Sequence, residues 1–329
     1  MFALVGLLDS LEVKELELKN RIVMPPMHTG LATRGGAVTN HLVEHYVKRS
    51  EMIGLLIVEH CYVSIEGKLS HKQLGIYDDK LISGLEKLSS NVHALSCPVV
   101  IQINHAGSKT NIETTGIQPI APSPNENAKE LHLKEIDGLV EAFAKAAERA
   151  MKAGFDGVEI HGAHGFLLNQ FYSPLTNQRS DDYGGSLENR IRFPLEVVER
   201  AKEKIGCRLL LYRLGSDDLN PAGIKIEDSQ KFAIKLEKAG VDIIDVSGGI
   251  CGSRPGHLQD KQGYFIPQAQ QIKKVVNIPV IGVGGIKESR YADKLIKDGK
   301  IDLVAIGREL LKDADWALKA IKTLKRARF

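Results

Sequence analysis

The stretch LLIVEH, residues 55–60, decides the fold, because an unbroken apolar run is followed directly by Glu59 and His60. Strands that are covered on both faces, as in parallel α/β sheets, have such continuous apolar sequences. The same pattern recurs in VVIQ, residues 99–102. The stretch therefore predicts a buried parallel strand with polar side chains at its C-terminal end.

Eight runs of this kind alternate with segments of helical periodicity, which is typical of repeated βαβ units. The expected strands are Arg21–Met24, Leu55–Val58, Val99–Ile103, Gly157–Ile160, Leu209–Arg213, Ile243–Val246, Val280–Val283 and Leu303–Ile306. We therefore expect an α/β fold in which residues 1–329 form a single (β/α)8 TIM barrel domain, since barrels of this length are common. An open doubly wound sheet is the alternative.

The segments between and before the strands support this arrangement. Ile136, Leu139 and Phe143 fall on one face of a helix that is expected to end at Gly154. Residues 11–18 alternate loosely between apolar and charged side chains, which predicts an N-terminal β-hairpin that caps the bottom of the barrel. The connections over residues 105–129 and 161–186 are too long for tight turns, and both follow strand C-termini. We expect them to lie over the catalytic face.

The charge balance points away from nucleic acids and membranes. Basic residues number 44 and acidic residues 41, and the two signs are interspersed along the chain. Hydrophobic residues make up 43% of the sequence, but no stretch approaches the ~18 apolar residues of a membrane span. The apolar run over residues 1–8 has no basic region before it, so we do not expect a signal peptide. No nucleic-acid or membrane partner is expected.

The cysteines suggest neither a metal site nor disulfides. They stand alone at positions 61, 97, 207 and 251, without the CxxC spacing of zinc or iron–sulfur ligands. We expect no bound metal and a reducing, cytoplasmic location.

The residues at the C-terminal ends of the expected strands are unusually polar. They include Pro25, Pro26, Met27, His28, His60, Gln102, His161, His164 and Arg213. A single buried His or Arg is more often structural than catalytic. Burying so many polar side chains at one end of the barrel is costly unless they have a function. TIM barrels carry their active sites at this end. Their convergence therefore predicts the active site.

A phosphate site is predicted beside them. Gly284 and Gly285 follow the seventh strand, and Gly307 and Arg308 stand at the start of what we expect to be the last helix. Glycines let backbone N–H groups approach a phosphate, and an arginine adds a bidentate charged contact. Aldolases and isomerases use the same position, so the pattern does not identify the phosphate compound. Glycines that serve only tight turns are the alternative.

In five stretches the sequence resembles the old yellow enzyme family of FMN-dependent NAD(P)H:flavin oxidoreductases. The stretches are LKNRIVM (18–24), IQINHAG (101–107), VEIHGAHG (158–165), NQRSDDYGGSLENR (177–190) and IGRELL (306–311). The resemblance implies FMN as cofactor, NADH or NADPH as reductant, a small-molecule substrate and a homo-oligomer. The 177–190 stretch itself is expected to be a hydrogen-bonded structural loop.

The resemblance also implies roles for residues near the flavin. Residues Pro25–His28 and His60 would line it, and Gln102 would hydrogen-bond its pyrimidine edge. Arg213 would lie beside N1 and O2, where a fixed cation favours the reduced, negatively charged ring. His161 and His164 are similar to the pair that donates hydrogen bonds to a substrate carbonyl oxygen.

Three positions depart from the family pattern. Phe166 stands where a proton-donating tyrosine is usual, and His60 replaces a small residue. The segment MHTG, residues 27–30, is similar to the bacterial 2,4-dienoyl-CoA reductase branch. That branch normally continues into an iron–sulfur segment and nucleotide-binding domains, which these 329 residues do not contain.

We therefore expect an FMN-dependent oxidoreductase that uses NADH or NADPH to reduce activated alkenes. An amine dehydrogenase or demethylase related to trimethylamine dehydrogenase is the enzymatic alternative, because such oxidations need not use the missing tyrosine. A flavin-binding barrel with little turnover is the second alternative.

Overall fold

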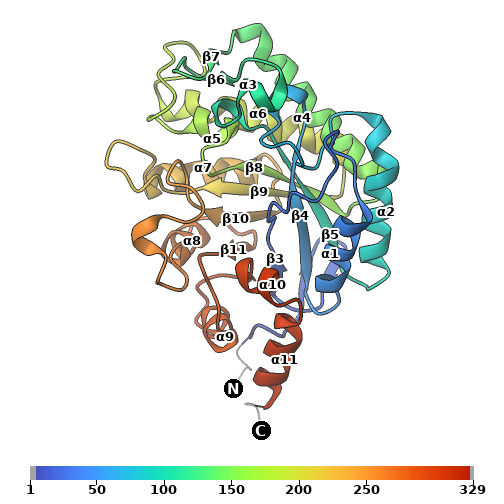
Figure 1. Cartoon of the computed structure of the whole chain (residues 1–329). Helices are drawn as coiled ribbons and strands as arrows, with labels where there is room; N and C mark the ends of the chain where they lie inside the picture. The colour runs from blue at the N-terminus through green and yellow to red at the C-terminus, as the bar shows by residue number, and fades with distance from the viewer. Residues whose placement is uncertain (1–4, 327–329) are drawn as a thin grey trace.

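Eight parallel strands close into a barrel in the computed structural model, which describes residues 5–326 (Figure 1). The barrel strands are β3 (Ile22–Met24), β4 (Leu55–Tyr62), β5 (Val99–Asn104), β8 (Gly157–Gly162), β9 (Leu209–Gly215), β10 (Ile243–Ser247), β11 (Val280–Gly282) and β12 (Leu303–Ala305). Neighbours around the ring follow chain order, and β12 pairs with β3. The (β/α)8 barrel is confirmed, and the open doubly wound sheet is wrong.

Helices surround the strands (Figure 1). The larger ones are α1 (Asn40–Ser50), α2 (Ile82–His93), α4 (Leu133–Lys152), α6 (Leu187–Ile205), α7 (Ile226–Lys238), α8 (Ile266–Lys273), α9 (Ser289–Lys297) and α11 (Trp316–Arg326). Shorter helices are α3 (Ile112–Thr115), α5 (Leu167–Tyr172) and α10 (Arg308–Lys312). As predicted, α4 buries Ile136, Leu139 and Phe143. The chain then turns at Gly154, whose φ of +76° suits glycine.

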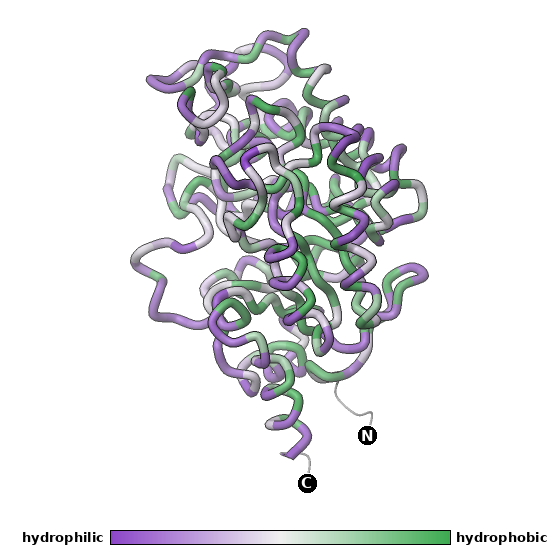
Figure 2. Tube along the Cα trace, turned by 45° about the vertical axis from the view of Figure 1, so that its right-hand side comes forward, coloured by the Kyte–Doolittle hydropathy of each residue, from purple (hydrophilic) through white to green (hydrophobic). Residues whose placement is uncertain are grey.

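Successive side chains of each strand point alternately into the barrel and out toward the helices, and this builds two apolar layers. Val23, Ile57, Val100 and Leu211 belong to a cluster inside the barrel. The strand residues between them pack outward against the helices in a larger cluster. Hydrophobic segments accordingly run through the middle of the molecule, and hydrophilic ones gather at its periphery (Figure 2). The side chain at a strand position therefore lies either inside the barrel or between the strand and the surrounding helices.

The N-terminal hairpin closes one end of the barrel interior. It pairs β1 (Leu11–Val13) with β2 (Leu16–Leu18) in antiparallel register. Val13 and Leu18 are buried in the same cluster as the interior strand residues. The predicted cap is confirmed. Of the apolar run over residues 1–8, the first four residues lie outside the described range, and Leu7 is fully buried.

The two long connections pack on each other at the opposite end. They carry α3, α5 and a small sheet of β6 (Ile120–Ala121) and β7 (Lys129–Glu130), all in the upper part of Figure 1. Arg179, from the 177–190 stretch, donates to the carbonyl oxygens of Pro122 and Leu131. The same arginine pairs with Asp181 at 2.6 Å. The structural interpretation of this stretch is confirmed.

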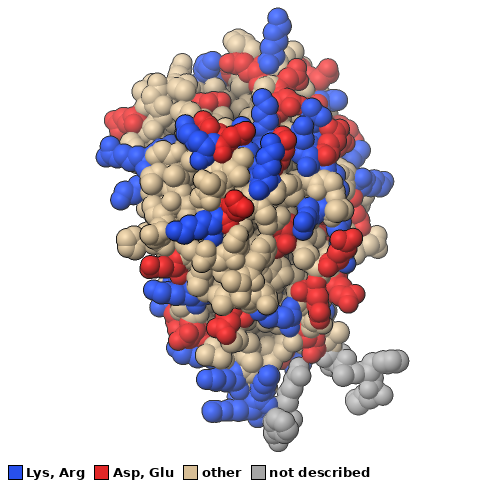
Figure 3. Space-filling view, turned by 90° about the vertical axis from the view of Figure 1, so that its right-hand side faces the viewer, with Lys and Arg blue, Asp and Glu red and all other residues tan. Residues whose placement is uncertain are grey.

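Charges of both signs are interspersed on the face shown in Figure 3. Among residues 5–326, no helix is both long enough and apolar enough to cross a membrane.

Candidate active site

A cavity of about 440 Å³ lies at the C-terminal ends of several barrel strands. Seven residues predicted from the sequence line it: Pro25, Met27, Arg213, Gly284, Gly285, Gly307 and Arg308. They come from β3, β9, β11 and β12 or from the segments directly after these strands. The predicted phosphate and flavin residues of these strands therefore do converge.

Three glycines form a close-fitting wall of this cavity. Gly284 and Gly285 have φ values of +120° and +65°, which L side chains rarely adopt. A Cβ on Gly285 would lie 2.7 Å from Nη2 of Arg308, and one on Gly307 would lie 2.9 Å from Sδ of Met27. Only glycine leaves room here for a ligand group to approach the backbone.

Arg308 begins α10, a helix of five residues, and α11 follows it. The prediction that Gly307 and Arg308 begin the last helix is wrong, because the chain becomes extended at Asp313 before α11 starts. Arg308 nevertheless reaches the cavity, where its Nη2 donates to Oη of Tyr264 at 3.4 Å. A guanidinium thus stands beside the glycine wall.

Arg213 points into the barrel from β9. It lies two residues beyond Leu211, which packs inside the barrel, and its side chain is only 7% exposed. Its Nε lies 3.5 Å from Oδ2 of Asp245, the residue opposite it on β10. The cation is therefore held at the cavity by a fully buried carboxyl group.

Gln102 lies deeper in the barrel. Its Nε2 donates to Oε1 of Glu159 at 2.7 Å, across the register from β5 to β8. Its Oε1 is buried and has no hydrogen-bond partner among the described residues. Burial, followed by the charge of Asp245, raises the pKa of Glu159 well above its usual value. Gln102 thus has a free acceptor and a neighbour that resists ionisation.

His161 and His164 form a perpendicular pair, with ring centres 5.0 Å apart. Nε2 of His164 lies 2.7 Å from Oγ of Ser247, while Nδ1 of His161 is buried without a partner among the described residues. Burial is the main reason why both imidazoles have pKa values well below the usual one, and the positive charge of Arg213 lowers them further. Both rings are therefore neutral at pH 7 and can donate hydrogen bonds without carrying charge.

The backbone at His164 is unusual. Its φ is +58°, in the left-handed region that a residue with a Cβ enters only at a cost. Its N–H donates to the carbonyl oxygen of Gly248 at 3.0 Å, which helps to hold this conformation. Strain of this kind is typical of functional sites.

His60 faces the same group because of a bulge in β4. Val58 pairs with Ile101 and Cys61 with Ile103, so β4 carries one extra residue over this distance. With this extra residue, Cys61 faces the outer layer and His60 faces inward. The ring centre of His60 lies 6.2 Å from that of His161. His60 therefore joins the predicted histidine pair.

His28 meets this group from the other side. Its ring stacks on His60 at 5.1 Å, and its Nδ1 lies 3.0 Å from Oε2 of Glu59. Its Nε2 lies 3.0 Å from Oγ of Ser70. The contacts predicted for the other six site residues with a flavin or a substrate stay predictions, because the 440 Å³ cavity is not lined by Pro26, His28, His60, Gln102, His161 or His164.

Phe166 fills the position of the missing tyrosine. Its ring lies 4.8 Å from that of His161 and 5.5 Å from that of His60. The ammonium of Lys109 stands 5.5 Å from the ring centre of Phe166. The site therefore has an apolar ring where a phenol would offer a proton.

Several side chains of this site were not predicted from the sequence, among them Asp245, Glu159, Tyr264 and Gln73. Asp245 and Glu159 face inward at alternate strand positions. The two-residue alternation of a strand could therefore have identified them from the sequence. Tyr264 and Gln73 lie on loops, and nothing in the sequence pattern distinguishes them. Tyr264 contacts Arg308, and Gln73 contacts His60, only because the chain folds back on itself.

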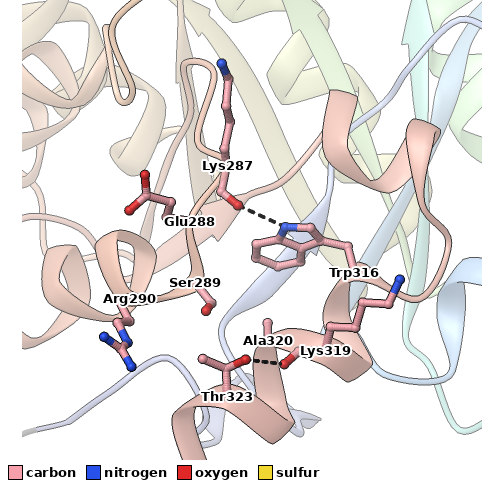
Figure 4. A pocket seen from close by; sticks show the side chains of 8 residues that line it. All are labelled: Lys287, Glu288, Ser289, Arg290, Trp316, Lys319, Ala320 and Thr323. Atoms are coloured by element: carbon pink, nitrogen blue, oxygen red, sulfur yellow. Dashed lines mark hydrogen bonds between the residues drawn. The ribbon is translucent and has the colours of Figure 1, made fainter. Parts of the chain in front are cut away.

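A second pocket, of about 300 Å³, lies between the start of α9 and α11 (Figure 4). Its lining residues are Lys287, Glu288, Ser289, Arg290, Trp316, Lys319, Ala320 and Thr323. Nε1 of Trp316 donates to the carbonyl oxygen of Lys287 at 3.0 Å. Lys287 also lines the 440 Å³ cavity, so the two pockets share this residue. None of the residues predicted from the sequence lies in this second pocket.

Comparison with known proteins identifies the family. The chain belongs to the NADH:flavin oxidoreductase / NADH oxidase family, which it matches over residues 7–327. It is 43% identical over 321 residues to the NADH oxidase of Thermoanaerobacter brockii. That match covers 94% of this chain but only 49% of the relative, so the chain spans about half the length of this protein.

Solved structures share the fold. The old yellow enzyme homologue of Zymomonas mobilis superposes with a TM-score of 0.85 at 28% identity, covering 97% of this chain and 93% of that one. A 2-naphthoyl-CoA reductase in complex with 2-naphthoyl-CoA superposes with a TM-score of 0.90 at 26% identity. It matches 97% of this chain and 52% of its own. The predicted resemblance to old yellow enzymes is confirmed.

Membership of this family implies FMN as cofactor and a nicotinamide as reductant, and the chemistry of the residues gathered at this end of the barrel suits FMN. The glycine wall beside Arg308 suits a phosphate. The free acceptor Oε1 of Gln102 and the cation of Arg213 suit the polar edge of an isoalloxazine. Among residues 5–326, no group of three or more His, Cys, Asp or Glu side chains is placed to bind a metal ion.

Proposed function

We propose that this chain is an FMN-dependent NAD(P)H oxidoreductase that reduces activated alkenes, such as enones and enoates. The observation that carries the proposal is the convergence of a glycine-and-arginine wall, Arg213 and a pair of neutral histidines at one end of the barrel. Bound FMN would accept hydride from NADH or NADPH and deliver it to the alkene.

The proposed phosphate contacts are the backbone at Gly284, Gly285 and Gly307 and the guanidinium of Arg308. The lack of room for a Cβ at these glycines supports this assignment, because a side chain there would collide with Arg308, Tyr264 or Met27 and keep a phosphate away from the backbone. Arg308 would add charge-assisted hydrogen bonds. Pro25, Pro26, Met27 and His28 are proposed to line the ring system.

Arg213 and Gln102 are proposed to bind the flavin's polar edge. A buried guanidinium favours negative charge nearby more strongly than an exposed one would, because solvent screens it little. Arg213 would therefore favour the reduced cofactor. Gln102 can accept through Oε1 while its Nε2 stays bonded to Glu159.

His161 and His164 are proposed to bind the substrate's carbonyl oxygen. Their lowered pKa values keep them neutral, so they would polarise the carbonyl through N–H donors, leaving the β-carbon electron-poor. His60 would line the same space. Because Phe166 has no proton to give, protonation of the α-carbon would fall to water or to another side chain.

The experiment that tests this proposal measures the two half-reactions separately. The purified protein should be yellow and release FMN on denaturation, and NADH or NADPH should bleach the flavin anaerobically. Cyclohexenone should then restore the oxidised spectrum in stopped flow. Recovery of FAD, or of no flavin after reconstitution with FMN, would contradict the cofactor assignment.

The same measurement decides between the alternatives. Bleaching by an amine, with no reoxidation by any enone, would replace alkene reduction with the amine dehydrogenase or demethylase function. Flavin binding without turnover by any donor or acceptor would indicate a binding barrel. The similarity to an NADH oxidase and to an old yellow enzyme homologue supports the reductase.

We further propose that residues 1–329 work as a single domain within a cytoplasmic homo-oligomer. The resemblance to old yellow enzymes is the basis for the oligomer, and the four unpaired cysteines agree with a reducing compartment. Sedimentation at micromolar concentration tests the assembly, since a monomer alone would contradict it.

A further inference from the structure

The barrel interior below the cavity holds two carboxyl groups against one cation. Glu159 on β8 and Asp245 on β10 are both fully buried, and β9, which carries Arg213, lies between these strands. Two ionised carboxylates beside a single guanidinium would leave a negative charge without compensation in an interior of low polarity. Such a charge is costly enough that one group takes up a proton instead.

Hydrogen bonding indicates which carboxyl group is protonated. Oε1 of Glu159 already accepts from Gln102, but its Oε2 and both oxygens of Asp245 have no donor among the described residues. A proton on Oε2 of Glu159 gives Asp245 a donor and leaves Asp245 ionised. Asp245 is also the carboxyl group in contact with Arg213, at 3.5 Å, so the negative charge is best placed there.

The titration behaviour of the pair agrees with this arrangement. Burial, and after it the neighbouring Asp245, raises the pKa of Glu159 well above its usual value. Burial also raises the pKa of Asp245, but the charge of Arg213 and the hydrogen bond that a protonated Glu159 donates work in the opposite direction. Among residues 5–326, the polar groups found to interact with the pair are Gln102 on β5 and Arg213 on β9, and of these two Arg213 carries a charge.

We propose that Glu159 and Asp245 share one proton, held by Glu159, and that the carboxylate of Asp245 positions Arg213 and reduces the positive charge this arginine presents to the flavin site. Both acids are positioning residues, because they act through Arg213 and Gln102. The inference rests on the proposed flavin site for its effect on reduction potential, but the proton itself is a property of the protein alone.

The reduction potential of bound FMN distinguishes the two acids. Asp245→Asn removes the negative charge and should raise the potential, shifting the equilibrium toward reduced flavin at least tenfold, or about 30 mV for a two-electron couple. Glu159→Gln mimics a protonated glutamic acid and should shift this equilibrium less than tenfold. Asp293→Asn, in a carboxylate paired with Lys297 on α9, is the matched control and should have no effect. An equal or larger rise in Glu159→Gln would overturn the proposal.

Infrared spectroscopy of the apoprotein tests the proton without flavin, substrate or turnover. The wild-type apoprotein, labelled with ¹³C-glutamate, should show a protonated carboxyl band at pH 7 that shifts with the label. Glu159→Gln should lose this band. Absence of a protonated glutamate in the wild type refutes the inference even if a variant fails to fold. Such a result would leave the proposed alkene reduction intact. If the band were present but NADH and NADPH failed to reduce the flavin, the shared proton would stand and the proposed function would be contradicted.

Discussion

Nε2 of Gln73 lies 2.7 Å from Nδ1 of His60 and fixes the tautomer of this imidazole. Oε1 of Gln73 accepts from the backbone N–H of Leu69 at 2.6 Å, so its amide nitrogen must face His60 as a donor. Nδ1 of His60 is therefore the acceptor, and its hydrogen sits on Nε2. His60 is neutral, with a hydrogen-bond donor available to the site.

The first prediction is that His60 stays neutral down to about pH 4. Burial, and after it the charge of His28, lowers the pKa of His60 to about 4. Because this folded value lies below the unfolded one, the contribution of His60 to stability is complete above pH 6.5 and is lost as pH falls toward 4. It amounts to roughly 3 kcal/mol at about 1.36 kcal/mol per pKa unit.

Histidine NMR and denaturant unfolding between pH 7 and 4 measure both effects. Gln73→Glu should raise the pKa of His60, since a carboxylate at Nδ1 favours the imidazolium. Gln118→Glu, at an exposed position, is the control and should leave it unchanged. A wild-type His60 that titrates near 6.5 would contradict the prediction that it stays neutral and make it a candidate proton donor.

The second prediction separates the two arginines of the cavity. Arg213→Ala should lower the reduction potential of the flavin and slow its reduction by NAD(P)H, because the removed charge favours the reduced cofactor. Arg308→Ala should weaken FMN retention more than it shifts the potential. Spectroelectrochemistry and FMN dissociation constants test this, and the inverse pattern would mean that the two roles are exchanged.

The third prediction concerns the glycine wall. Gly285→Ala should weaken FMN binding at least tenfold, because its Cβ would lie 2.7 Å from Nη2 of Arg308 in the proposed phosphate site. Gly299 has the same φ of +65°, but a Cβ there would meet no atom within 4 Å, so Gly299→Ala isolates the backbone strain, about 1 kcal/mol. Equal FMN affinity in both variants would show that Gly285 serves only a turn.

The fourth prediction concerns Phe166, whose ring centre lies 4.8 Å from that of His161 and 5.5 Å from the ammonium of Lys109. Phe166→Tyr should accelerate reoxidation of the flavin by cyclohexenone, by roughly 10²-fold if the phenol acts as a general acid. Reduction by NAD(P)H should stay nearly unchanged. Phe166→Leu, which removes the ring without adding a proton, is the control in stopped flow. Rapid wild-type reoxidation with no gain in the tyrosine variant would mean that another group already supplies the proton.

The sequence alone was enough to predict the barrel and the polar residues at the C-terminal ends of its strands. All eight strands occur where apolar runs were found, because strands buried on both faces require such runs wherever they occur. Gly284, Gly285 and Gly307 were identifiable for a similar reason. A position without room for a Cβ excludes every residue but glycine, so the requirement is visible in the chain itself.

Only the tertiary structure decided how the polar side chains meet. The inward direction of His60 depends on the bulge in β4, which is a mismatch in register with β5 and has no local sequence signal. The contact of His60 with Gln73, 13 residues further along the chain, and that of Arg213 with Asp245 on the neighbouring strand both depend on how the chain folds back. Their protonation states follow from these contacts and from burial, and neither exists until the barrel has closed. The sequence therefore determined which groups stand at the strand ends, and the closed barrel determined which of them carry charge.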